Sequence, residues 1–86
     1  MSDLKELSHI ITTLKTPARI EAFLHELLTP AEVKELSKRW NIVTMLNAGT
    51  PQREIAAKLR TSLCAVTRGS KELQKEKSIF RDILEK

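Results

Sequence analysis

Apolar residues recur along this chain at the three- and four-residue spacing of a single helix face. The first predicted helix runs from about Asp3 to Leu14, with Ser2 or Asp3 as its cap. A second follows Thr16 and Pro17, because threonine caps a helix and proline suits its first turn. The apolar positions of these two helices are Leu4, Leu7, Ile10, Ile11, Leu14, Ile20, Phe23, Leu24, Leu27 and Leu28.

A third and longest helix is predicted from Pro30 to about Ala48. Thr29 is its cap, Glu32 stands at the capping-box position, and Gly49 supplies the stop. Apolar residues lie on more than one side of this helix, which predicts a central place in the fold. Trp40 is interpreted as a core or interface anchor rather than as a residue that stacks on a ligand.

The stretch 50–73 predicts two short helices with a tight connection. Thr50 caps the first helix, with Pro51 in its first turn, and Thr61 or Ser62 caps the second. This order indicates a helix-turn-helix whose second helix, 63–73, is the recognition helix. The apolar positions expected to face the core are Ile55, Ala56, Leu59, Leu63, Val66 and Leu73.

Arg60 stands at the first turn position, where many helix-turn-helix units have glycine. Two alternatives follow. Arg60 adopts a left-handed backbone conformation at some energetic cost, or the turn has another shape.

A last short helix, Ile79–Leu84, is predicted after Ser78 as its cap, and its apolar residues indicate that it docks on the rest of the chain. The fold class is therefore all-α: one helix-turn-helix domain of about six helices over residues 1–86. Residues 1–48 would supply N-terminal and central dimerisation helices, residues 50–73 the helix-turn-helix and residues 78–85 the docking helix.

The charge of the chain is unevenly distributed. Residues 1–50 carry six basic and six acidic side chains, whereas residues 51–86 carry nine basic and five acidic ones, so the whole net charge of +4 (nine minus five) lies in the second half. An excess of positive charge on the helix-turn-helix half is typical of a nucleic-acid-binding face. A solubilising surface charge is the alternative.

The polar side of the predicted recognition helix carries small, polar and basic residues that fit a major groove. We expect DNA contacts from this side, and from the start of the preceding helix, where backbone N–H groups meet phosphates. Lys71 and Arg60 are included for their charge and placement. The predicted DNA-binding residues are Gln52, Arg53, Arg60, Cys64, Ala65, Thr67 and Lys71.

Other classes of function find little support in the sequence. His9 and His25 have no neighbouring carboxylate and nucleophile, and Cys64 has no Cys or His at metal-ligand spacing, so an enzyme is not expected. No apolar run approaches the ~18 residues of a membrane span. The lone cysteine fits a reducing compartment, and we expect a cytoplasmic protein without membrane contact.

A dimer is expected for two reasons. The apolar stripes of the first two helices are broad for a chain of 86 residues. A single recognition helix also reads few base pairs, and a two-fold dimer on a palindromic operator reads two half-sites.

Three segments carry a family resemblance: LLTPAEVKELSKRWNIV (Leu27–Val43), GTPQREIAAKL (Gly49–Leu59) and TRGSKEL (Thr67–Leu73). Their order resembles the tryptophan repressor family of bacteria, which has shorter members of uncertain ligand and operator. The resemblance implies an intertwined homodimer and repression gated by L-tryptophan, whose indole slots between the central and recognition helices and favours the DNA-competent state.

The resemblance also implies a ligand site. Arg39 and Arg68 match two arginines that hold the indole and carboxylate, and Thr29 matches a threonine from the partner chain. Gly69 matches a glycine that leaves room for the ligand. Two alternatives stay open, namely that Arg39 is an ordinary surface cation and that Arg68 contacts a phosphate.

Glu72 departs from the family pattern, which has serine there. Its carboxylate either pairs with the ligand's ammonium or pairs with Arg68 or Arg39 and closes the pocket. Cys64 and Ala65 replace an alanine and a threonine of the family, so the operator sequence is expected to differ.

The sequence therefore predicts a dimeric DNA-binding transcriptional regulator, acting as a repressor, with L-tryptophan or a related ligand as its candidate co-repressor. The alternatives are a DNA binder of this fold that needs no ligand, and a helical protein-interaction module with an incidental basic face. A preference for one palindromic DNA sequence would distinguish either kind of DNA binder from the protein-interaction module.

Overall fold

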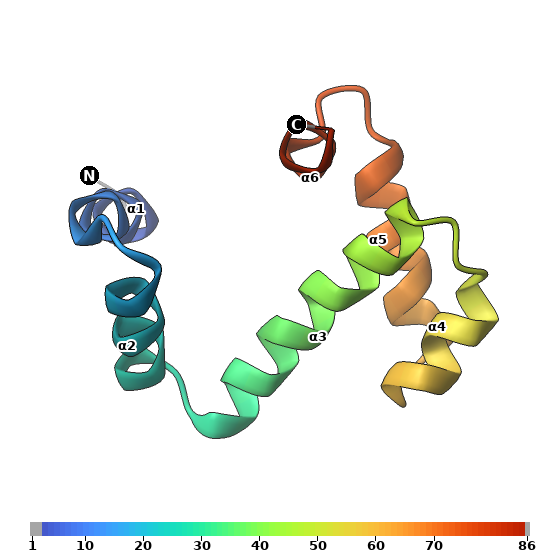
Figure 1. Cartoon of the computed structure of the whole chain (residues 1–86), viewed down its shortest axis with the longest axis horizontal. Helices are drawn as coiled ribbons and strands as arrows, with labels where there is room; N and C mark the ends of the chain where they lie inside the picture. Colours follow the sequence, from blue (N-terminus) through green and yellow to red (C-terminus); the bar gives the residue numbers. More distant parts are fainter. Residues whose placement is uncertain (1–2, 86) are drawn as a thin grey trace. The chain divides into compact units, whose positions relative to one another are not determined.

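The computed structural model describes residues 3–85, which form six α-helices and no strand. The all-α class and the number of helices are as predicted. The cap expected from Ser2 lies outside the described residues. In chain order the helices are α1 (Asp3–Leu14), α2 (Pro17–Leu27), α3 (Pro30–Asn47), α4 (Gln52–Leu59), α5 (Leu63–Gln74) and α6 (Ile79–Leu84), as Figure 1 shows.

The chain divides into two compact units, Met1–Lys34 and Glu35–Lys86. In the first unit, α1 and α2 pack against each other across a tight connection in which Lys15 has a left-handed backbone, with φ 64°. Thr16 caps α2 as predicted, because its hydroxyl accepts a hydrogen bond of 3.3 Å from the N–H of Arg19.

The apolar stripes of the first unit are only partly buried. None of its described residues is fully buried, and Leu4 is 70% exposed. Ile10 and Leu27 are also exposed, while the remaining apolar positions predicted for α1 and α2 are half-buried. Two amphipathic helices alone cannot enclose a core, so these stripes are available to a partner.

The start of α3 has the predicted capping box. The Thr29 N–H donates to Glu32 Oε1 at 2.9 Å, and the Glu32 N–H donates to Thr29 Oγ1 at 3.2 Å. This reciprocal pair satisfies two backbone donors that have no partner inside the helix.

The core of the second unit joins α3, α4 and α5. Ile42, Ile55 and Val66 are buried and contact one another, with Met45, Leu46, Ala56, Leu59 and Ala65 packed around them. Leu63, predicted to belong to the apolar side of α5, is instead 44% exposed. It is the first residue of α5, ahead of the turn that meets α4.

In the turn of the helix-turn-helix, Arg60 adopts the left-handed backbone conformation, the first of the two predicted alternatives. Arg60 has φ 52° and ψ 50°, and its N–H is directed at the carbonyls of Ala56 and Ala57 as α4 ends. Ser62 then caps α5, accepting 3.1 Å from the Ala65 N–H. A non-glycine residue in this conformation costs roughly 1–2 kcal/mol, so the rest of the unit holds this turn in place.

The start of α4 differs from the prediction. Pro51, not Thr50, is the residue before the first helical one, and no side chain caps the helix. Pro51 has an extended ψ of 144°, and the Thr50 N–H instead bonds to the Met45 carbonyl at 3.1 Å, closing the end of α3.

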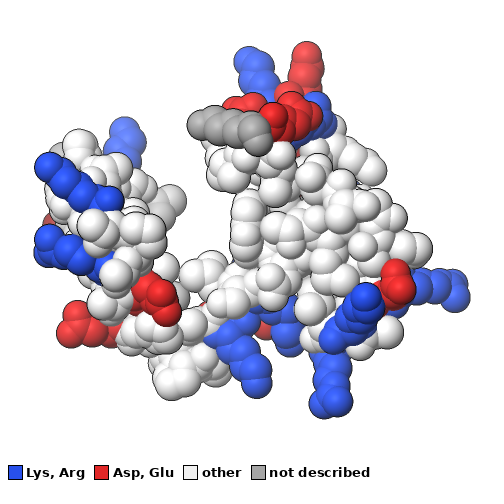
Figure 2. Space-filling model, in the orientation of Figure 1, with Lys and Arg blue, Asp and Glu red and all other residues white. Residues whose placement is uncertain are grey.

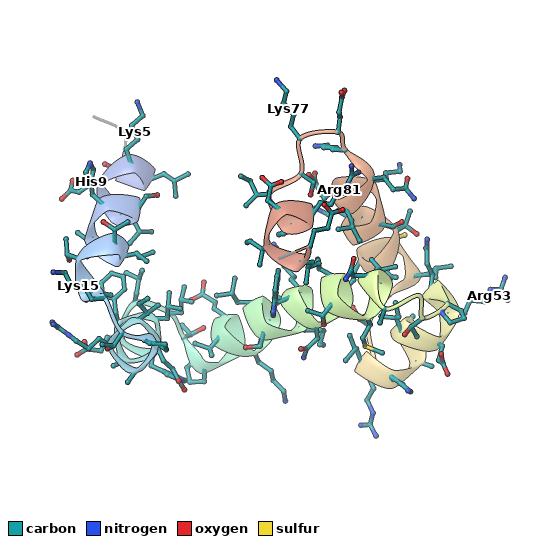
Figure 3. The ribbon with its side chains drawn as sticks, turned by 45° about the horizontal axis from the view of Figure 1, so that its top comes forward. Lys5, His9, Lys15, Arg53, Lys77 and Arg81 are labelled. Carbon is teal, nitrogen blue, oxygen red and sulfur yellow. The ribbon has the colours of Figure 1, made fainter. Side chains whose placement is uncertain are left out.

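The last helix docks on the second unit, as predicted. Ser78 is buried and caps α6, and an Arg81 Nη2 donates to the Leu73 carbonyl of α5 at 3.1 Å. Figure 3 shows Arg81 beside the end of α5. Trp40 of α3 meets Phe80 of α6 edge to face, with ring centroids 6.0 Å apart, and is still 39% exposed. Trp40 is therefore a packing anchor at the rim of the unit.

Candidate nucleic-acid interface and ligand pocket

The outer face of α5 is a shallow depression that gathers several of the predicted DNA-binding residues. It is lined by Leu63, Cys64, Thr67, Arg68, Lys71, Glu72 and Lys75. Cys64 and Lys71 are exposed and Thr67 is half-buried. The face thus offers a thiol, a hydroxyl and ammonium groups to a groove, the chemistry that reads base edges and phosphates.

Gln52 and Thr67 lie together although 15 positions separate them. The Thr67 hydroxyl donates a hydrogen bond of 3.0 Å to Gln52 Oε1, joining the first residue of α4 to the middle of α5. This bond fixes the side chain of Gln52 at the edge of the recognition helix. Two predicted DNA contacts thereby form one polar unit.

Basic side chains project from α4. Arg53 and Arg60 are exposed, and Lys58 lies on the same helix. Figure 2 shows Lys and Arg side chains standing out from the region of α4, and in Figure 3 Arg53 points away from the helices. Exposed cations of this kind suit phosphate contacts rather than base recognition.

Ala65 has different surroundings from its neighbour Cys64. It is half-buried, packs against the core and lines the inner pocket described next, rather than the outer depression. Its predicted DNA contact stays a prediction.

A pocket of about 300 Å³ lies within the second unit, between α3, α5 and α6. It brings together four residues predicted from the family resemblance: Arg39, Arg68, Gly69 and Glu72. Thr29, the fifth, belongs to the first unit, where its side chain caps α3. Its predicted role was to reach the pocket of a partner chain, which a single chain does not test.

The remaining lining residues were not predicted to belong to a ligand site, although Ala65 was predicted to contact DNA: Glu35, Ile42, Val43, Ala65 and Phe80. Glu35 is one helical turn before Arg39, a spacing that could have indicated it. Phe80 reaches the pocket only because α6 folds back beside α3 and α5, and no local pattern encodes that return.

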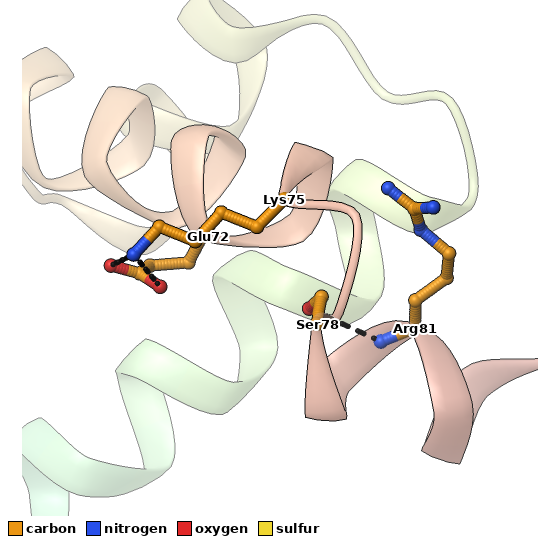
Figure 4. A network of polar contacts seen from close by, with 4 residues as sticks. All are labelled: Glu72, Lys75, Ser78 and Arg81. Carbon is orange, nitrogen blue, oxygen red and sulfur yellow. Dashed lines mark hydrogen bonds and ion pairs between the residues drawn. The ribbon is translucent and has the colours of Figure 1, made fainter.

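Charged groups at the pocket are paired in a specific way. Arg39 Nε lies 3.7 Å from Glu35 Oε1, and Lys75 Nζ lies 3.0 Å from each carboxylate oxygen of Glu72. Figure 4 shows the second pair. Glu72 thus pairs with neither Arg39 nor Arg68, and Arg68 has no ion pair within residues 3–85. The pocket retains one uncompensated guanidinium.

Gly69 of α5 faces side chains of α3. A Cβ built at this position would stand 3.0 Å from Ile42 Cγ2 and 3.5 Å from Leu46 Cδ1. Helix packing therefore gives a reason for this glycine besides room for a ligand.

The described part of the chain offers no metal site and no membrane-spanning helix. Residues 3–85 contain no cluster of three His, Cys, Asp or Glu side chains that could hold a metal ion. None of their helices combines the length and the apolar character that crossing a membrane requires.

Comparison with known proteins gives a consistent result. The family model described as Trp repressor protein matches residues 2–86. A Trp operon repressor homolog of Chlamydia trachomatis serovar L2 is 35% identical over 79 residues, covering 86% of this chain and 84% of the chlamydial one. A Trp operon repressor homolog of Actinobacillus succinogenes is 41% identical over 68 residues, covering 74% and 67% of the two chains. No solved structure matches the chain significantly.

Proposed function

This chain belongs to the Trp repressor protein family, and on that premise we propose that it represses transcription as a homodimer on a palindromic operator, under the control of L-tryptophan or a related ligand. The family consists of DNA-binding regulators rather than enzymes. A protein that represses transcription would act on chromosomal DNA, so we expect it to be located in the cytoplasm.

The observation that best supports sequence-specific DNA binding is the contact between Gln52 and Thr67. Their hydrogen bond of 3.0 Å joins α4 to α5 at the outer face of the recognition helix. Exposed Arg53, next to Gln52, and exposed Arg60, at the other end of α4, would contact phosphates, as would Lys71 from α5. Cys64 lies on the same face and would meet base edges.

The accessible apolar stripes of α1 and α2 support a homodimer. Leu4, Ile10 and Leu27 are exposed, and burial of such surface in a second copy would stabilise both chains. Each dimer would then present two recognition helices to two half-sites.

The pocket between α3, α5 and α6 supports ligand control. Its walls include Ile42, Val43 and Phe80, and its rim carries Arg39 and Arg68. An indole would lie against the apolar walls, and a guanidinium would pair with the ligand's carboxylate. Thr29 would reach the same ligand from the partner chain. A ligand seated against α5 would bias the position of the recognition helix.

The test is selection of duplexes from a random DNA pool by the full chain, with and without millimolar L-tryptophan, with the mass of the complex measured in parallel. Enrichment of one palindrome, bound by two chains and dependent on tryptophan, is the expected result. Enrichment of the same palindrome with and without tryptophan would indicate a DNA binder that needs no ligand. Binding without any sequence preference would contradict the proposal and favour a protein-interaction module.

A further inference from the structure

Glu72 and Arg68 each line two cavities. Both belong to the inner pocket between α3, α5 and α6, and both belong to the depression on the outer face of α5. Residues four positions apart in a helix lie one above the other on the same side. Arg68 and Glu72 therefore occupy neighbouring positions where the pocket meets the predicted DNA face.

The partners of these two groups differ. Arg68 has no ion pair among residues 3–85, although Glu72 is within one turn. The Glu72 carboxylate instead contacts Lys75, with both oxygens 3.0 Å from Nζ (Figure 4). Lys75 is the residue that follows the last turn of α5 and also lines the outer depression. Its side chain is 64% exposed, and that of Glu72 is 47% exposed.

An exposed pair of this kind is weak and exchanges readily with another cation. A ligand with an α-carboxylate and an α-ammonium carries the two charges on one carbon, which matches the adjacent Arg68 and Glu72. The apolar walls of the pocket would hold its side chain.

We propose that Glu72 exchanges Lys75 for the α-ammonium of an apolar amino acid, and that the released Lys75 ammonium binds a DNA phosphate. The exchange selects ligands that carry an amino group. It also frees the Lys75 ammonium on the DNA face of each chain when the ligand binds, while the ligand's carboxylate pairs with Arg68. This inference rests on the proposed ligand-controlled DNA binding. It adds that Glu72 binds the ligand's amino group and that Lys75 couples this binding to DNA affinity.

Calorimetry with two probes tests the ligand half. L-tryptophan and indole-3-propionate share the indole and the carboxylate, and the second lacks the amino group. We expect the wild-type chain to bind tryptophan at least about ten-fold more tightly, as a charge-assisted hydrogen bond provides. Glu72→Gln should weaken tryptophan binding and leave indole-3-propionate bound as tightly or more tightly. Lys75→Gln, which removes the competing cation, should tighten tryptophan binding up to about five-fold without affecting indole-3-propionate.

The salt dependence of DNA binding tests the second half, on the duplex selected by the wild-type chain or, if none is selected, on a random duplex. Saturating tryptophan should steepen the slope of log affinity against log salt by about 0.9 per chain, the effect of one added phosphate contact. Lys75→Gln should remove this increment. Lys77→Gln is the matched control, because Lys77 lies in the connection to α6 and lines neither cavity, and it should retain the increment.

Equal affinity for the two probes, failure to bind tryptophan, or a full increment in Lys75→Gln would overturn the inference. These failures are separable from failure of the proposed function. A chain that selects a palindrome but does not discriminate between the probes is a DNA regulator without this exchange. A chain that discriminates between the probes but selects no sequence is a ligand-binding protein of another kind.

Discussion

The Thr67 hydroxyl donates to Gln52 Oε1 at 3.0 Å, and this bond is the side-chain hydrogen bond between the two helices of the helix-turn-helix in the described structure. It leaves the amide nitrogen of Gln52 as a donor. The orientation of Gln52 is thus set by Thr67 before any DNA is bound, which reduces the entropy lost on recognition.

Thr67→Val keeps the shape of the side chain and removes the hydroxyl. We expect the free energy of unfolding to fall by about 1 kcal/mol, since the acceptor on Gln52 loses a part-buried partner. The preference for one operator sequence over random DNA should also weaken. Urea denaturation and competition binding measure the two effects. A double-mutant cycle with Gln52→Met checks the cause, and zero coupling would show that the bond contributes nothing.

Lys71→Gln removes one cation from the outer face of α5. Binding should weaken to a similar degree for operator and random duplexes, and the salt slope should fall by about 1 per chain, because a phosphate contact carries no sequence information. Titrations at several salt concentrations measure this. A loss restricted to the operator would instead assign Lys71 to a base contact.

Gly69→Ala places a methyl group between α3 and α5. Alanine gains about 1 kcal/mol of helix propensity over glycine. Its Cβ would stand 3.0 Å from Ile42 Cγ2, and Ile42 is buried against Ile55 and Val66. Overpacking costs about 1–3 kcal/mol, so we expect a net loss of stability.

Denaturation of Gly69→Ala beside Ser70→Ala resolves these opposing effects, because the second variant gains propensity without a new Cβ. A Gly69→Ala protein more stable than the wild type would mean that Ile42 yields, and that close packing is not the reason for this glycine.

Arg60→Gly relieves the left-handed backbone of the turn. We expect a gain of about 1 kcal/mol in the free energy of unfolding, since glycine adopts this conformation without the penalty. DNA affinity should fall, because an exposed cation beside the recognition helix is lost. Lys15→Gly is the control: Lys15 also has a positive φ, in the first unit, and its removal should affect stability alone. Unchanged DNA affinity of Arg60→Gly would remove Arg60 from the interface.

Helix boundaries and caps were predictable because their causes are local. Thr16, Ser62 and Ser78 cap helices as expected, each accepting a hydrogen bond from an N–H three positions later. The Thr29–Glu32 capping box is confirmed as well. The start of α4 was misplaced by one residue, since proline fits both the first turn and the extended position before it.

The surroundings of the pocket were less predictable because they depend on choices between neighbours. Glu72 has Arg68 four residues before it and Lys75 three residues after it, and both spacings permit an ion pair. No local feature of the sequence predicts which of the two cations pairs with Glu72. The structure shows that it is Lys75. Phe80 reaches the pocket through the return of α6, and the Lys15 backbone is left-handed without a glycine or asparagine to signal it.

The shared position of Arg68 and Glu72 on two cavities has a consequence for how such a regulator diverges. A substitution that adapts either residue to a new effector also alters the surface offered to DNA, so the two specificities are inherited as one trait. Drift in the effector would require compensating change in the operator. We expect lineages of this protein to change their effector metabolite and their target sites together, or neither.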